Sequence, residues 1–234
     1  EKEKLKRALE WAEGMEKALS SQKPNSFHLK FISEQTVNFL LEEAPKMPRL
    51  INHIEGSCVK AFIRKGIVGM LVGSGGVGKT HALAQLAISI TTGIPWLGKY
   101  PVEKTGYVFM GMGENSEEDI HRLLRKTVKK MFQEQTSFLN KNPLLEASKR
   151  LSVASFNGLD SSFICKGRST QAYELLLWEL KEKEPEDGWS CIILDPISRF
   201  LGADAETDNA SATRFIALLE KLTLELEGRP TVLF

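Results

Sequence analysis

The sequence predicts an α/β protein in which a mostly parallel central sheet is flanked on both faces by helices. Short apolar segments rich in β-branched residues are typical of buried strands, and they alternate with longer segments that carry apolar residues at helical spacing. A glycine-rich loop joins the first of these strands to the first of these helices. Because parallel strands need crossover connections, the intervening helices are expected to cover both faces of the sheet.

The predicted elements follow one another along the chain in strand–helix order. Strands are expected at 67–72, 106–110, 151–156, 191–195 and 231–234, and helices at about 79–92, 116–131, 172–182 and 208–227. The second helix has a start signal of its own, because Ser116 and Asp119 stand at the spacing of a capping box. We expect the run at 67–72 to be a buried strand, since five of its six residues are apolar and three of them are β-branched.

The first 55 residues predict a separate, short helical segment that serves as a linker or an interaction region. Helical spacing of apolar residues runs over about 1–22 and again over 33–44, and Pro24 and Asn25 interrupt it. Residues 56–234 are predicted to form the α/β core. The chain begins without methionine and stops at Phe234 inside an apolar run, so we expect the core to be truncated at its carboxyl end.

Composition narrows the class of protein further. Lysine and arginine total 31 and aspartate and glutamate total 30, for a net charge of +1, which argues against a protein that coats nucleic acid by charge alone. The three cysteines, Cys58, Cys165 and Cys191, show no metal-binding spacing and predict free thiols in a reducing compartment. No apolar run is long enough to span a membrane. These features favour a cytoplasmic location.

The glycine-rich loop has the pattern of a phosphate-binding loop. It matches GxxxxGK[ST] and consists of Gly73, Ser74, Gly75, Gly76, Val77, Gly78, Lys79 and Thr80. In this pattern the backbone amides surround phosphate oxygens, the lysine reaches the β- and γ-phosphates, and the final hydroxyl binds Mg²⁺. The sequence therefore predicts binding of ATP with Mg²⁺, with Lys79 also contributing to catalysis. His81 follows directly and is expected to cover the α-phosphate with its backbone N–H.

Two acids are candidates for the rest of the site. Asp195 ends an apolar strand and is predicted to hold Mg²⁺ together with Thr80, although an aspartate before Pro196 could instead only cap a turn. Glu114 follows the strand at 106–110 and could orient or deprotonate the attacking water. Alternatively, Glu114 belongs with Glu117 to the acidic start of the next helix, where its negative charge interacts favourably with the helix dipole. Position alone leaves these two interpretations of Glu114 open.

Three segments of this core resemble the RepA-type hexameric replicative helicases, an AAA-type, RecA-like branch of the P-loop ATPases. They are GMLVGSGGVGKTHALAQLAISITTGIPWLG, GYVFMGMGENSEEDIHRLLRK and CIILDPISRFLGADAETDNASATRFIALLEKL. The resemblance covers about residues 60–234 and implies a RecA-like fold. It also implies that Glu114 is the catalytic glutamate and Asp195 the Walker B aspartate. Arg122 and Arg199 match family arginines, with surface ion pairing as the alternative role of each.

The same resemblance implies a function and a set of partners. Family members form hexameric rings that move along single-stranded DNA at the expense of ATP. Residues 1–55 match nothing in the family core and could be an interaction segment or the tail of an upstream domain, such as a primase-like module. We therefore expect an ATP-hydrolysing motor of a ring-forming DNA helicase in DNA replication, without membrane association. A recombinase- or regulator-type ATPase that binds DNA without unwinding it, and a nucleotide-gated interaction module, remain alternatives. The basic cluster near 122–130 could bind a nucleic-acid backbone or be a solvated helix face.

Overall fold

The computed structural model describes residues 46–133, 143–202 and 208–234. The chain divides into two compact units, Glu1–Lys46 and Met47–Phe234, and every element described below belongs to the second. The helices predicted at 1–22 and 33–44 lie outside the described residues.

A five-stranded parallel sheet forms the centre of the second unit, in the order β3-β9-β8-β4-β5. The strands span Val68–Gly69 (β3), Thr231–Leu233 (β9), Trp189–Asp195 (β8), Tyr107–Met112 (β4) and Leu151–Ser155 (β5). All five run in the same direction, so their carboxyl ends lie along one edge of the sheet. This confirms the predicted fold, a RecA-like α/β arrangement with flanking helices.

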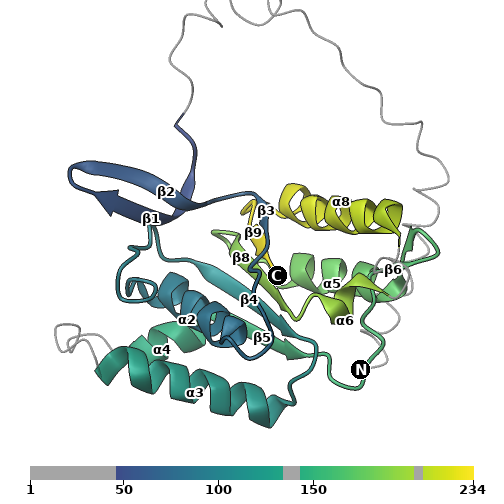
Figure 1. The fold of residues 1–234 in the computed structure, drawn as a ribbon, viewed down its shortest axis with the longest axis horizontal. Coiled ribbons are helices and arrows are strands. Elements are labelled where there is room, and N and C mark those ends of the chain that lie inside the picture. The colour runs from purple at the N-terminus through teal and green to yellow at the C-terminus, as the bar shows by residue number, and fades with distance from the viewer. Residues whose placement is uncertain (1–45, 134–142, 203–207) are drawn as a thin grey trace, which may run out of the picture. The chain divides into compact units, whose positions relative to one another are not determined.

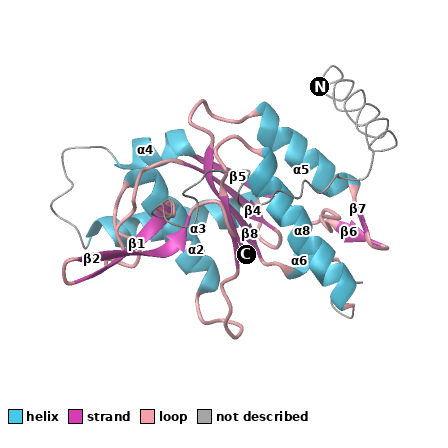
Figure 2. Cartoon of the chain, turned by 90° about the horizontal axis from the view of Figure 1, so that it is seen from above, coloured by secondary structure: helices cyan, strands magenta, loops and turns pink. Residues whose placement is uncertain are grey.

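Helices cover both faces of the sheet (Figures 1 and 2). One face carries α2 (Lys79–Thr92), α3 (Glu117–Gln133) and α4 (Pro143–Arg150), and the other carries α5 (Gln171–Glu182), α6 (Ser198–Leu201) and α8 (Asn209–Glu225). The helices predicted at 79–92, 172–182 and 208–227 are confirmed, with α2 beginning and ending where the sequence indicates. The pattern did not predict α4.

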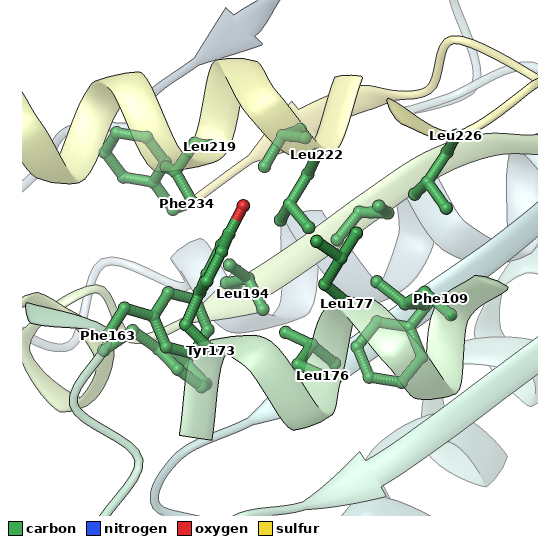
Figure 3. Close-up of a cluster of buried hydrophobic side chains, with 14 of the residues drawn as sticks. Phe109, Phe163, Tyr173, Leu176, Leu177, Leu194, Leu219, Leu222, Leu226 and Phe234 are labelled. Carbon is green, nitrogen blue, oxygen red and sulfur yellow. The ribbon is translucent and has the colours of Figure 1, made fainter. Parts of the chain in front are cut away.

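The buried strands divide their side chains between two cores, as a sheet covered on both faces requires. On β8, Cys191 and Ile193 pack toward α2, whereas Ile192 and Leu194 pack toward α5 and α8. Figure 3 shows the second of these cores, where Tyr173 lies between the two helices. The side chains of β4 divide in the same alternating way. Because of this alternation, the side chain of a residue at the end of a strand lies on the same face of the sheet as the residue two positions before it.

The segment at 67–72 differs from its prediction. Only Val68 and Gly69 are assigned as strand, and Met70 and Val72 are 61% and 75% exposed. The reason is its place in the sheet: within the described residues β3 has β9 as its one neighbour. The adjoining backbone continues that pairing, because Leu71 N donates to Phe234 O at 2.7 Å. The predicted buried strand is therefore an edge strand.

A β-hairpin precedes the sheet. Its first strand lies in the segment at 1–55 that was predicted to be helical, and no regular structure was predicted for its second strand. Strand β1 (Arg49–Glu55) pairs antiparallel with β2 (Cys58–Arg64). Leu50 and Ile51 are buried in the core that surrounds α2, and Arg49 pairs with Glu103 at 2.9 Å. The compact unit that holds the sheet spans Met47–Phe234. A second hairpin, β6 (Ile164–Cys165) with β7 (Arg168–Ser169), precedes α5.

No helix in the described part of the chain is both long enough and apolar enough to cross a membrane.

Candidate active site

The carboxyl edge of the sheet brings the predicted site segments to one side of the molecule. The phosphate loop follows β3, Glu114 lies two residues beyond β4, and Asp195 is the last residue of β8. Strands β4 and β8 are direct neighbours, with Met112 opposite Asp195. The strand order places β9 between the phosphate-loop strand and β8. Open parallel sheets bind ligands at this edge, where loops from several strands converge.

The phosphate loop leads into the amino terminus of α2 in a conformation that glycine makes possible. Gly76 and Gly78 have φ angles of 78° and 94°, in the left-handed region that other residues avoid. Gly78 is the N-cap residue and supplies no side-chain acceptor to the first helical amides. The helix therefore begins with free N–H groups, and the helix dipole adds partial positive charge there. Such an end is suited to bind phosphate oxygens.

Lys79 holds the loop together in this structure. Its ammonium group donates to the carbonyl oxygens of Gly73 at 2.7 Å and Ser74 at 3.0 Å. Both carbonyls belong to the start of the loop, so the lysine bridges the two ends of the glycine-rich turn. Thr80 is half-buried in the first turn of α2, and His81 is exposed beside it. The roles predicted for these residues and for the loop from Gly73 to Gly78 stay predictions.

Asp195 is oriented by the alternation of β8. Cys191 and Ile193 pack against α2, and since strand side chains alternate, Asp195 lies on that same face of the sheet. Its side chain is therefore on the side where the phosphate loop enters α2. Asp195 is 5% exposed. A buried carboxylate of this kind is available to a cation.

Three hydrogen bonds fix the backbone around Glu114. Gly113 N donates to Asp195 O at 2.8 Å, which ties the end of β4 to the end of β8. On the other side, Phe156 N donates to Met112 O at 2.8 Å and the Ser155 hydroxyl donates to Asn115 O at 2.7 Å. The Glu114 side chain itself is 53% exposed. A fixed backbone with an exposed carboxylate is what a base acting on water needs.

Arg199 contacts Glu114 directly. Its Nε donates to Glu114 Oε1 at 3.4 Å, and its side chain crosses the peptide just before Glu114. A Cβ at Gly113 would lie 2.5 Å from the Arg199 Cβ, so only glycine permits this approach. The sequence matched Arg199 to a family arginine but did not reveal this contact. Gly113 was also missed as a site residue, and the glycines that flank Met112 at the end of a strand were its one signal.

Arg122 has a different neighbour. Its guanidinium donates to Asp119 at 2.7 Å on the exposed side of α3. The Ser116 hydroxyl and then Arg122 hold the pKa of the Asp119 carboxyl below its usual range. Asp119 N also donates to the Ser116 hydroxyl at 3.2 Å, which confirms Ser116 as the N-cap of this helix. The surface ion pair weighed for Arg122 is therefore present.

The acids and hydroxyl of the site suit Mg²⁺ better than a metal held by protein ligands alone. Among the described residues no cluster of three or more His, Cys, Asp or Glu side chains could hold a metal ion. Mg²⁺ is usually bound through one or two protein oxygens together with substrate phosphates and water. Asp195 and the Thr80 hydroxyl could supply those protein oxygens.

A cavity of about 770 Å³ lies elsewhere in the described part of the chain. It is lined by residues of β5 and α5 together with Phe109 and Trp189, and it contains none of the predicted site residues. The phosphate loop, by contrast, lies exposed on the surface. Its assignment depends on loop geometry and chemistry.

The fold and this edge of the sheet together define an α/β P-loop domain of the ATPase type. Comparison with known families agrees, because the model of the AAA domain matches residues 54–233, well over half of the chain. The chain belongs to this AAA domain family. No curated protein matches the chain.

Proposed function

We propose that the chain is an ATP-hydrolysing RecA-like motor, and that it drives a ring-forming DNA helicase in DNA replication. The observation that carries the motor is the carboxyl edge of the sheet, where a phosphate loop shares one edge with two acids that lie at or just beyond the ends of paired strands. Membership of the AAA domain family supports nucleotide binding and ATPase chemistry. The helicase assignment is supported by the resemblance of the same segments to RepA-type proteins.

Nucleotide binding in this proposal begins at the phosphate loop. The backbone amides at the start of α2 and the Lys79 ammonium group bind the β- and γ-phosphates. Lys79 then exchanges the Gly73 and Ser74 carbonyl oxygens, which hold it in the ligand-free loop, for phosphate oxygens. Thr80 and Asp195 hold the metal on the α2 face of the sheet. When bound, Mg²⁺ neutralises charge on the phosphate oxygens.

Hydrolysis requires a base near the attacking water. Glu114 accepts a proton from that water as its oxygen bonds to the γ-phosphorus and the bond to the β-phosphate oxygen breaks. The products are ADP and inorganic phosphate. Lys79 stabilises the negative charge that develops on the transferred group. Anchoring of the Met112–Asn115 backbone keeps the Glu114 carboxylate within reach of the site.

Self-association is part of the proposal because the site is open to solvent. Residues 73–77 of the loop are exposed and Glu114 is half exposed. Phosphoryl transfer benefits from exclusion of bulk water, and a neighbouring copy covering this edge would provide it. A ring with the nucleotide between subunits, as the RepA resemblance implies, satisfies this need. Single-stranded DNA is the proposed track, and an upstream primase-like domain is a proposed companion.

Replacing Glu114 with glutamine tests the hydrolytic mechanism. The Glu114→Gln variant should release phosphate from ATP at least about a hundredfold more slowly, because the amide cannot accept the proton. ATP affinity should stay near that of the wild type. Glu117→Gln is a matched control, since Glu117 is an exposed acid of the same segment in the first turn of α3. Normal turnover in the Glu114 variant would remove this residue from the mechanism.

A strand-displacement assay on a forked duplex tests the helicase assignment. ATP-dependent unwinding that is lost in the Glu114→Gln variant supports a helicase. DNA-stimulated ATP hydrolysis without unwinding would favour the regulator-type ATPase. Tight ATP binding with no turnover, even in the presence of DNA, would favour the nucleotide-gated module.

A further inference from the structure

A partly exposed group of aromatic side chains lies where the β1–β2 hairpin packs on the loop after α2 (residues 93–106). Phe62 of β2 stacks on Tyr100 of the loop, with ring centroids 4.3 Å apart and ring planes inclined by 22°. His53 of β1 and Trp96 of the loop also contact Tyr100, at centroid distances of 5.8 and 6.0 Å. We call these four residues the hairpin cluster. Phe62 is 49% exposed although Tyr100 covers one face of its ring, so a large aromatic surface is open to solvent.

The hairpin cluster is held on a fixed backbone. Trp96 is buried, and its indole N–H donates to the Ala82 carbonyl in the first turn of α2 at 2.9 Å. The loop also pairs with the edge of β1 that faces away from β2, because Asn52 N donates to Pro101 O at 2.8 Å. The hairpin itself extends away from the central sheet (Figure 1). Rings that are already in place lose little conformational entropy when a ligand binds to them.

A lysine shares the face of the hairpin on which the cluster lies. Lys60 is opposite His53 in the register of the hairpin, so the two side chains project on the same face, and Phe62 is two residues farther along β2. Lys60 pairs with Glu55 at 2.9 Å, and both side chains are 66% exposed. An ion pair that is so exposed is weak, and its lysine can exchange the carboxylate for another anion.

Positive charge predominates around the hairpin cluster. The hairpin and the loop contain two acidic residues, Glu55 and Glu103, and each of them is paired with a basic residue. Helix α2 packs against both segments in one core and contains no acidic residue. Lys99 has its ammonium group 5.5 Å from the centre of the Tyr100 ring. The same segments carry six basic residues, which are Arg49, Lys60, Arg64, Lys65, Lys99 and Lys104. This surface therefore complements a polyanion, although the whole chain has a net charge of only +1.

We propose that the hairpin cluster binds single-stranded nucleic acid, with an unpaired base stacked on Phe62 and the neighbouring phosphates bound by Lys60 and Lys99. Aromatic rings beside basic side chains suit such a strand, because every base has a flat face and every nucleotide carries a negative phosphate. Bases in a duplex are covered by their neighbours, so a duplex gains only the charge interaction. The inference shares with the proposed function the choice of single-stranded nucleic acid, but it concerns a surface outside the ATP site.

Fluorescence anisotropy of a labelled deoxythymidine oligonucleotide, titrated with the full chain, tests the role of the Phe62 ring. Phe62→Leu keeps an apolar side chain but removes the ring, and it should raise Kd at least about fivefold. Phe62→Trp restores a ring and should restore binding. Val59→Ala is a matched control that should leave Kd unchanged. Val59 is 45% exposed on the same strand but lies opposite Ile54, in a cross-strand pair that alternates with the pair of His53 and Lys60.

Two further measurements separate base stacking from charge. A strand of the same length without bases has the same phosphates, and the wild type should bind it at least about fivefold more weakly than the complete oligonucleotide. Lys99→Gln should lower the slope of log Kd against log salt concentration by about 0.7, which corresponds to one lost phosphate contact with a single strand. Phe62→Leu should leave this slope unchanged, because it removes no charge.

The possible results distinguish this inference from the proposed function. Equal Kd values for the wild type and Phe62→Leu would overturn the stacking role of the hairpin cluster. Equal binding of the strands with and without bases would also overturn it, and would indicate a surface for anions in general, such as acidic peptides. Phosphate release from ATP is measured on the same proteins. Normal release without oligonucleotide binding would overturn the inference and leave the ATPase standing, whereas Phe62-dependent binding without any release would overturn the motor and leave the inference standing.

Discussion

Asp195 illustrates how a single residue acquires its place from a simple rule. Its position at the end of an apolar run predicted a strand-end acid, and alternation along β8 assigns its carboxylate to the α2 face. The sequence therefore places Asp195 at the carboxyl end of a strand, and the contacts of Cys191 and Ile193 place it on the same face of the sheet as α2. Glu114 differs because it lies beyond the regular strand. Its surroundings depend on Gly113 and Arg199, which are far apart in the sequence, so no local pattern predicts them.

Asp208 offers a test of a single residue through pH. The Ser211 hydroxyl, and then the backbone amides of Ala210 and Ser211, hold the pKa of the Asp208 carboxyl below its usual range. Because this pKa is lower in the folded state, the capping carboxylate stabilises the fold above the unfolded-state pKa of about 4, and that contribution is lost as the pH falls. In Asp208→Asn the side chain still accepts a hydrogen bond but does not titrate.

Chemical denaturation of the two proteins between pH 7 and pH 3 checks this expectation. The stability advantage of the wild type over Asp208→Asn should be largest near neutral pH and should shrink below about pH 4. A difference that stays constant over the whole range would show that the charge of Asp208 contributes nothing to the cap.

At the scale of elements, α5 and α8 are joined by one buried hydrogen bond as well as by apolar contacts. The Tyr173 hydroxyl donates to the Leu218 carbonyl at 2.9 Å, and the ring is fully buried between the two helices (Figure 3). Burial raises the pKa of this hydroxyl, so it stays protonated and continues to donate throughout the physiological range. The bond fixes α5 relative to the helix that supports β9.

Removing this hydroxyl should weaken the fold measurably. Tyr173→Phe should lower the free energy of unfolding by about 1 to 2 kcal/mol, because the buried Leu218 carbonyl loses its partner. Tyr100→Phe is a suitable control, since its ring stacks on Phe62 and its hydroxyl has no hydrogen-bond partner among the described residues. Urea titration measures both variants. Equal stability of Tyr173→Phe and the wild type would show that the bond is not formed in solution.

Several elements could be predicted from sequence, and the exceptions have physical causes. Helix α2 follows from its periodicity and from glycines at both ends. The exposure of the 67–72 segment depends on which strand lies at the edge, and strand order is set by pairing between distant segments. The β1–β2 hairpin did have a local signal, because Gly56-Ser57 separates two runs rich in β-branched residues. Charged residues in both runs obscured the alternation that would have predicted the two strands.

The whole molecule explains why predicted site residues from distant parts of the chain lie along one edge of the sheet. A parallel sheet directs every carboxyl end to the same edge, so the phosphate loop, Glu114 and Asp195 meet there although about 120 residues separate the first from the last. The same geometry brings Arg199 to Glu114, because α6 directly follows β8, the neighbour of β4. Sequence motifs predicted the members of the site. The sheet order determined which of them are neighbours.

The most direct test of this account is the change in unfolding temperature that ATP and Mg²⁺ produce. A ligand that binds only the folded state at about one hundred times its Kd adds roughly 2.7 kcal/mol, which for a chain of this size is a rise of about 5 to 10 °C. The account predicts this rise for the wild type and for Glu114→Gln, and little or none for Lys79→Ala, whose phosphate loop lacks the ammonium group. An equal rise in Lys79→Ala, or no rise in the wild type, would contradict a nucleotide site at this edge of the sheet.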